Sequence, residues 1–287
     1  MTRFSSIACC RARGSGVSRF GTKGLFTVLT LLWAASAAVA AQDDPPKHID
    51  VGSLPAKVVD EVVVPVPTEV FGVLDKLGSP NWHEVLRPVK IDRMGRRPQV
   101  ALLLGTVIAE GFIAVEAQES EEVKKIGKQV LVLARAIGVE KSVLTRTSSI
   151  IDAADKKDWQ RIRVELDGAS QDVKTAMIEL NDEQLAQLVS LGGWLRGTEA
   201  LTQVVLKSYS KDGAELLHQP ALLEYFQKRL DSEGDRLKRN AVVKKIRGRL
   251  PELQPLIEQP NGISEQKVNE IHSITRELVA AISAQES

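Results

Sequence analysis

The feature that most constrains the fold of this chain is a series of apolar stripes in which spacings of three and four residues alternate. Segments 123–137 and 159–180 both keep this spacing over several turns, as one face of an α-helix does. The gaps between successive stripes, around Gly138, Asp155–Lys157 and Asn181, are only a few residues long. Short connections force neighbouring helices to run antiparallel. The sequence therefore predicts an all-α fold, an antiparallel bundle of helical hairpins.

Residues that favour helix ends mark the limits of these segments. Pro98 suits the first turn of a helix whose body, residues 100–115, is apolar on nearly all sides, and such a helix normally lies at the centre of a fold. Gly138 suits the left-handed position after a helix. Residues 143–154 form a further amphipathic segment, and Asn181 suits the N-cap of the helix that follows the next connection.

Residues 211–287 are expected to hold shorter helices than the bundle, which spans residues 68–210. Pro220 opens one helix, residues 236–249 form another with a basic outer face, and Ser264 caps the last. Three prolines interrupt the chain between the last two helices, at Pro251, Pro255 and Pro260. These C-terminal helices form either a small second lobe or part of the same domain as the bundle.

The bundle is preceded by an extended segment rich in proline and valine, residues 41–67. Its five prolines are spaced too closely for a helix. Residues 58–66 suit one short strand, but no partner strand is found elsewhere in the sequence. We expect an extended linker or a strap on the surface, followed by a helix at Val70–Leu77.

The first 40 residues have the composition of a secretory signal peptide. They hold five basic residues and no acidic ones, and the uncharged run Leu25–Ala40 of 16 residues ends in a small-x-small tripeptide, Ala38-Val39-Ala40. A membrane-spanning helix needs about 20 apolar residues, so an uncleaved N-terminal membrane anchor is the alternative. We expect an exported protein, periplasmic or extracellular, with cleavage near Ala40.

Residue types that carry metal and redox chemistry are scarce. Cys9 and Cys10 precede the apolar run, so both are removed with a cleaved leader, and the mature chain then has no thiol. That excludes disulfides, thiolate metal sites and cysteine nucleophiles. The four histidines fall in four separate segments without the spacing of a metal site. We expect neither a metal nor a cofactor.

Two motifs have the spacing of catalytic or phosphate-binding elements without their context. Ser264 and Lys267 match the Ser-x-x-Lys spacing of penicillin-recognising enzymes, but the companion motifs are absent. The segment Gly192–Gly197 holds three glycines and follows no strand, so it does not fit a phosphate loop. Close helix packing, or a kink that opens onto a pocket, accounts for these glycines. The sequence therefore favours a role without catalysis.

Glu110 is the charge that the sequence singles out, because the helix around it is otherwise apolar apart from Thr106. A buried carboxylate must be neutral, paired or open to a water-filled cavity. Arg196 is its candidate partner: it also lies in an apolar helix, between Gly193 and Gly197, whose missing side chains let two helices approach. A guanidinium can satisfy both carboxylate oxygens. We expect a structural ion pair or, as the alternative, a ligand site.

Basic residues are concentrated in two segments, residues 87–97 and 228–249. The chain has 38 basic and 37 acidic residues, and without the five basic residues of the leader it has 33 and 37, a charge of −4, which gives no broad attraction for nucleic acid. Members of a candidate anion-binding surface are Arg87, Lys90, Arg93, Arg96, Arg97, Arg236, Lys238, Arg239, Lys244, Lys245, Arg247 and Arg249. Suitable partners are an anionic envelope polymer, an anionic lipid surface or an acidic protein. A solvated charged face is the simpler interpretation.

These observations favour an exported helical envelope protein with a non-catalytic binding or structural role. The alternative is a small-ligand receptor or an enzyme with a site inside the bundle near Glu110 and Arg196. A polar cavity beside these two residues favours the alternative.

Overall fold

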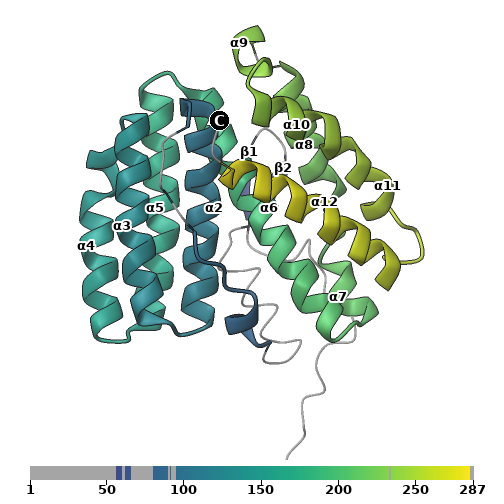
Figure 1. Ribbon diagram of the computed structural model, residues 1–287, viewed down its shortest axis with the longest axis horizontal. Coiled ribbons are helices and arrows are strands. Elements are labelled where there is room, and N and C mark those ends of the chain that lie inside the picture. The colour runs from purple at the N-terminus through teal and green to yellow at the C-terminus, as the bar shows by residue number, and fades with distance from the viewer. Residues whose placement is uncertain are drawn as a thin grey trace, which may run out of the picture. The chain divides into compact units, whose positions relative to one another are not determined.

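The computed structural model describes residues 56–59, 62–65, 80–89, 91, 95–232 and 234–284. All of them belong to one compact unit of the chain. The expected signal peptide and the helix expected at Val70–Leu77 lie outside these residues. Within the described part, helices dominate and pack against one another, which confirms the all-α bundle (Figure 1).

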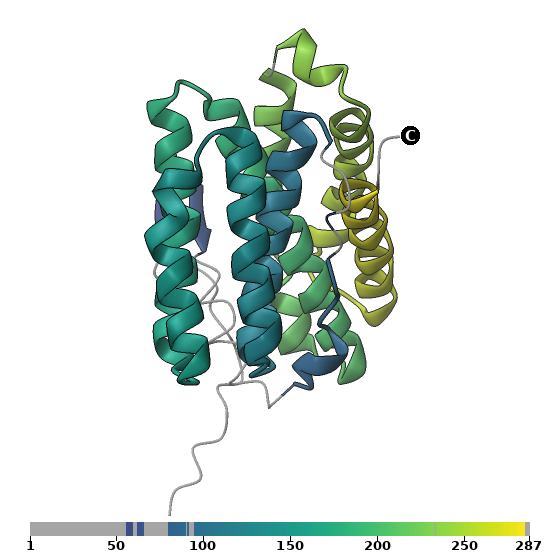
Figure 2. The ribbon, with the colours of Figure 1, turned by 60° about the vertical axis from the view of Figure 1, so that its left-hand side comes forward.

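Five long helices form the bundle, and the most apolar of them is central. They are α2 (Arg97–Glu116), α3 (Ser120–Ile137), α4 (Glu140–Asp155), α5 (Trp159–Glu179) and α6 (Glu183–Lys207). Every residue of α2 from Gln99 to Val115 is buried, because α3, α5 and α6 all pack against it. Figure 2 shows α3, α4 and α5 grouped on one side of α2, with α12 (Glu265–Ser283) on the other.

The connections between bundle helices are as short as the sequence predicts, and specific residues end each helix. Gly138 follows α3 with φ at 89°, the left-handed conformation that glycine adopts without strain. Asp158 caps α5, since its carboxylate accepts a hydrogen bond from the backbone N–H of Arg161 at 3.1 Å. Gly138 ends α3 and Asp158 begins α5, so each residue fixes a helix end beside one of the short connections.

The assignment of Asn181 as the N-cap of α6 is wrong. Asn181 has φ at 55°, and its backbone N–H donates to the carbonyl of Ile178 at 2.9 Å. It therefore belongs to the turn that ends α5, where asparagine tolerates the left-handed conformation better than most residues. Asp182 takes the N-cap position, without a side-chain hydrogen bond.

Glycines bring α2 and α6 into backbone contact. A Cβ atom on Gly105 would lie 1.9 Å from a backbone oxygen of α6, and one on Gly192 would lie 2.0 Å from a backbone oxygen of α2. Gly193 would make an ordinary contact at 3.5 Å, whereas Gly197 faces open space. Close packing thus explains Gly192, but the expectation that Gly197 also permits the approach is wrong.

The C-terminal region holds shorter helices and then α12. They are α7 (Lys211–Glu215), α8 (Pro220–Ser232), α9 (Asp235–Lys238), α10 (Ala241–Arg249), the 3-10 turn η4 (Leu250–Leu253) and α11 (Gln254–Ile257). The single helix expected at 236–249 is interrupted, because the Asn240 side chain accepts hydrogen bonds from two backbone N–H groups and caps α10. Ser264 caps α12 as expected, and α12 packs along α6.

The proline- and valine-rich segment contains a two-stranded hairpin. Strand β1 (Ala56–Val59) pairs antiparallel with β2 (Val62–Pro65), with Val59 opposite Val62. The expectation of one strand without a partner is wrong, because a two-residue connection brings a second valine-rich stretch beside the first. Pro65 stands at the end of its strand, where its missing N–H costs least.

Candidate functional site

A loop that precedes α2 packs against the bundle and lies beside buried polar groups. This entry loop, residues 80–89, contains the 3-10 turn η3 (Trp82–Glu84), and the side chains of Trp82 and Val85 are buried. Gln203 of α6 donates to the carbonyl of Glu84 at 2.8 Å, and Gln129 of α3 donates to the carbonyl of Val89 at 2.7 Å. The entry loop is therefore fixed to two helices of the bundle.

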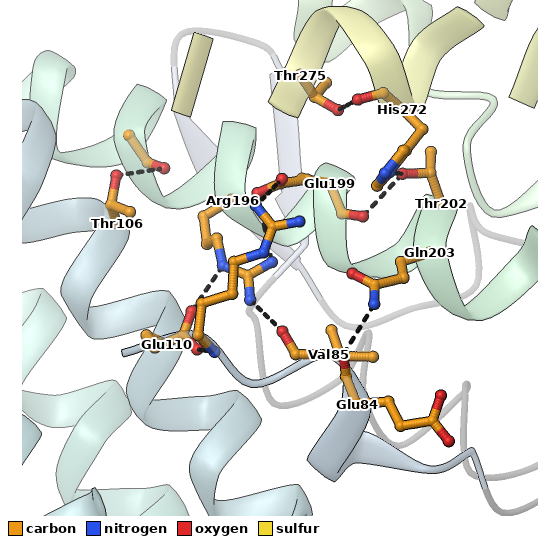
Figure 3. Close-up of polar contacts among 12 residues, drawn as sticks. Glu84, Val85, Thr106, Glu110, Arg196, Glu199, Thr202, Gln203, His272 and Thr275 are labelled. Atoms are coloured by element: carbon orange, nitrogen blue, oxygen red, sulfur yellow. Dashed lines mark hydrogen bonds and ion pairs between the residues drawn. The ribbon is translucent and has the colours of Figure 1, made fainter. Parts of the chain in front are cut away.

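The structure brings Glu110 and Arg196 together. Nε of Arg196 lies 2.6 Å from Oε2 of Glu110, and the side chain of each is only 1% exposed. The backbone contact between α2 and α6 lies within two turns of this pair, so the glycines and the ion pair share one interface. Figure 3 shows Arg196 reaching from α6 toward Glu110 on α2.

Two further residues complete a buried charge cluster, which we define as Arg87, Glu110, Arg196 and Glu199. Nη1 of Arg196 lies 3.5 Å from Oε2 of Glu199, and its Nη2 donates to the carbonyl of Val85 at 2.7 Å. The backbone N–H of Arg87 donates to Oε1 of Glu110, and the guanidinium of Arg87 pairs with Glu199. The cluster thus joins α2, α6 and the entry loop (Figure 3).

The charge cluster is balanced and internally satisfied. Its two carboxylates and two guanidinium groups cancel formally, and every carboxylate oxygen accepts a hydrogen bond from within the cluster. Burial of such groups is tolerated only when they are paired and hydrogen-bonded. Loss of any one member leaves the remaining charges of the cluster unbalanced.

Sequence reasoning found two members of the cluster and missed two. Glu199 lies three residues after Arg196 in the same apolar helix, a spacing that places both on one face, so this signal was present. Arg87 carried no such signal, because it looked like one member of a solvated basic loop. Its side chain is 37% exposed, in contrast to the other three.

A cavity of about 300 Å³ opens beside the charge cluster. Arg87, Pro88 and Val89 of the entry loop form one wall, and Val279, Ala280 and Ser283 of α12 form another. Thr106 and Glu110 of α2 and Arg196 of α6 complete the lining. Residues far apart in the sequence thus converge on one pocket, whose lining is largely apolar with a few charged groups.

His272 joins α12 to α6 next to the cluster. Nδ1 of His272 lies 3.0 Å from Oγ1 of Thr202, and that hydroxyl also donates to the carbonyl of Glu199 at 2.8 Å. Because a hydroxyl has one hydrogen, Nδ1 of His272 is the donor in this arrangement. Burial lowers the pKa of His272 below its ordinary value, although the nearby charge of Glu199 opposes that shift.

Two of the basic residues near the start of α2, Arg87 and Arg97, are paired with acidic side chains. Arg87 belongs to the charge cluster, and Arg97 donates to the carbonyl of Ile137 and pairs with Asp182 at 2.9 Å. Arg96 is exposed. Lys90 and Arg93 lie outside the described residues.

Acidic neighbours neutralise much of the second basic segment. Lys245 and Arg249 of α10 both pair with Glu277 of α12, at 3.1 and 3.0 Å, and Arg247 pairs with Asp231 of α8 at 2.7 Å. Lys244 and Arg239 are exposed, and Lys238 is partly exposed. The side chain of Arg236 lies outside the described part of the chain.

The pocket is the feature from which a function for this chain can be argued. Comparison with protein family models, curated proteins and solved structures finds no match to this chain. Among the described residues, no three histidine, cysteine, aspartate or glutamate side chains converge as metal ligands. Ser264 and Lys267 mark the start of α12, where the serine acts as its cap.

Proposed function

We propose that this chain is an exported, non-catalytic binding protein that holds a small ligand in the pocket beside the charge cluster. The observation that carries the proposal is the pocket itself, about 300 Å³ in volume, with Glu110 and Arg196 in its lining. Small-molecule sites have volumes of about 300–1,000 Å³ and combine apolar walls with a few fixed polar groups. The volume of this pocket is at the lower end of that range, and its lining combines valine and alanine side chains with the charged groups of Glu110 and Arg196.

The arrangement of Glu110 supports binding over catalysis. Both of its oxygens accept hydrogen bonds from N–H donors, one from Arg87 and one from Arg196. These two contacts tie the carboxylate to α6 and the entry loop, and its side chain is only 1% exposed. Glu110 therefore suits the task of holding Arg196 and the entry loop in position.

A purely structural role is the second candidate, and the internal balance of the cluster favours it. The cluster fastens the entry loop to α2 and α6 without any external group. A structural role requires no ligand, so occupancy of the pocket distinguishes the two candidates. The paired basic side chains of α10 are a further reason to expect the ligand in the pocket rather than on that helix.

A pocket-blocking variant tests the binding role. Ala280 is an exposed residue of the pocket wall, and Ser273 is exposed on the same helix seven residues earlier, outside the lining. Ala280→Trp fills the pocket mouth, and Ser273→Trp is the matched control. We expect at least one member of a defined set of small organic acids, amines and alcohols to bind the wild type and Ser273→Trp but not Ala280→Trp in ligand-observed NMR. Binding that survives in Ala280→Trp, or no binding at all, contradicts the proposal.

Export is tested separately. We expect mass spectrometry of the envelope fraction to find a chain that begins at Ala41 or Gln42, because cleavage follows the small-x-small tripeptide. Intact protein with Met1 in the cytoplasm would contradict both the exported location and the absence of thiols from the mature chain.

A further inference from the structure

We infer that the ligand is a small organic anion, whose carboxylate or phosphate group binds the guanidinium of Arg87 and whose apolar part lies against Val89 and Val279. The inference rests on the proposed function and adds the chemical class of the ligand. It follows from the hydrogen-bonding groups that the pocket still offers after the charge cluster has formed.

Two of the three charged residues in the pocket lining are held within the cluster, and the side chain of each is only 1% exposed. Arg196 uses Nε for Glu110, Nη1 for Glu199 and Nη2 for the carbonyl of Val85. Glu110 accepts one hydrogen bond on each oxygen. Because both side chains are almost fully buried, whereas that of Arg87 is 37% exposed, a ligand reaches Arg87 more readily than either of them.

Arg87 is the third charged residue of the lining, and it retains donors. Its Nη1 pairs with Glu199, while no hydrogen bond joins its Nε or Nη2 to another of the described residues. Its side chain is 37% exposed, whereas Glu199 behind it is fully buried. A guanidinium with one edge held and another open presents the paired N–H groups that carboxylates and phosphates accept.

The local charge also favours an anion. The charged groups that line the pocket are two guanidinium groups and one carboxylate. Glu199, the second carboxylate of the cluster, does not belong to the lining. A protonated amine in the same position meets the guanidinium of Arg87, with which it can form no hydrogen bond because both groups are donors only. Beyond the charged groups, Val89, Val279 and Ala280 provide an apolar wall, so a bare inorganic ion leaves much of the pocket unfilled.

Titration calorimetry on the purified protein tests the ligand class with a matched set of probes. The probes are hexanoate, hexyl phosphate, hexylamine, 1-hexanol and inorganic phosphate. We expect hexanoate or hexyl phosphate to bind at least about tenfold more tightly than hexanol or hexylamine, as one charged hydrogen bond is typically worth that much. The relative affinities of the two anions identify the head group, and inorganic phosphate alone is expected to bind weakly.

Two variants locate the anion at Arg87. Arg87→Lys keeps the charge next to Glu199 but loses the planar pair of donors, so the affinity for the anion is expected to fall about tenfold or more. Arg87→Gln combined with Glu199→Gln removes one charge of each sign, keeps the cluster balanced and is expected to fold without binding the anion. Circular dichroism checks the fold of both variants.

The outcomes separate this inference from the proposed function. Hexanol or hexylamine that binds in the pocket more tightly than the anions, with binding lost in Ala280→Trp, overturns the anionic class and leaves the binding role intact. Anion binding that is unchanged in both Arg87 variants overturns the role of Arg87. Inorganic phosphate that binds as tightly as hexyl phosphate overturns the apolar contact, and no binding by any probe overturns both proposals.

Discussion

A double-mutant cycle on Glu110 and Arg196 measures how far the fold depends on the buried pair. Glu110→Leu leaves two guanidinium groups and one carboxylate in the cluster, and Arg196→Leu leaves the reverse imbalance. Removing one partner of a buried ion pair typically costs about 3–5 kcal/mol. We expect both single variants to lose that much free energy of unfolding, with Arg196→Leu the larger because it breaks three hydrogen bonds.

The double variant should recover part of the loss, because Arg87 and Glu199 then form a balanced pair. The recovery is incomplete, since the carbonyl of Val85 and the backbone N–H of Arg87 both lose their partners. An unsatisfied buried group costs about 1–3 kcal/mol, so the double variant still loses about 2–6 kcal/mol. The two single losses sum to about 6–10 kcal/mol, so the coupling between the two sites is on the order of 4 kcal/mol.

Urea unfolding followed by far-ultraviolet circular dichroism gives the four free energies of the cycle. The dependence of the free energy on urea must be the same in all four proteins, since a change in that slope signals a change in the compactness of one state. Single effects that add to within about 0.5 kcal/mol in the double variant would refute the coupling.

Three further predictions concern packing, capping and protonation. Gly105→Ala places a Cβ atom 1.9 Å from the carbonyl oxygen of Val189, so it should lower the thermal midpoint at a cost of about 1–3 kcal/mol. Gly197 faces open space, so Gly197→Ala should raise the midpoint. Equal shifts in the two variants contradict this packing. Asn240→Ala removes the cap of α10 and should cost about 1 kcal/mol in urea unfolding. Burial lowers the pKa of His272 in the folded protein, so the unfolded chain binds the proton more readily, and stability should fall as the pH decreases from about 7 to about 5. His272→Gln should reduce that slope, and an unchanged slope contradicts the assignment.

The helices could be predicted because local signals determine them. The apolar spacing, Pro98 in a first turn, Gly138 after α3 and Ser264 before α12 all act within a few residues of one another, and the structure has each of them in that role. Asn181 shows the limit of such signals, because the same side chain suits an N-cap and a left-handed turn. Only the backbone on both sides decides between them.

The site could be predicted in part. A carboxylate in an all-apolar helix needs a cation, and few arginines lie in an apolar helix, so Glu110 and Arg196 could be paired from the sequence alone. The wall that α12 provides could not, because no pattern within Glu265–Ser283 indicates which helix it packs against. The position of Arg87 also depends on how the entry loop crosses the bundle, which is a tertiary property.

The proposed export would place helix α2 in a second environment, because an exported chain crosses the membrane before it folds. Among the described helices, it is the one that is long and apolar enough to cross a membrane, and 94% of its most apolar window is buried in the folded protein. Under the proposed export, that window would be exposed to the translocation machinery while the chain is still unfolded. A charged side chain at the centre of such a segment costs about 2.5–3.5 kcal/mol for entry into a bilayer, and less toward its ends. Under the proposed export, the carboxylate of Glu110 would therefore act in two environments: it would oppose retention in the membrane before folding, and after folding it binds Arg196.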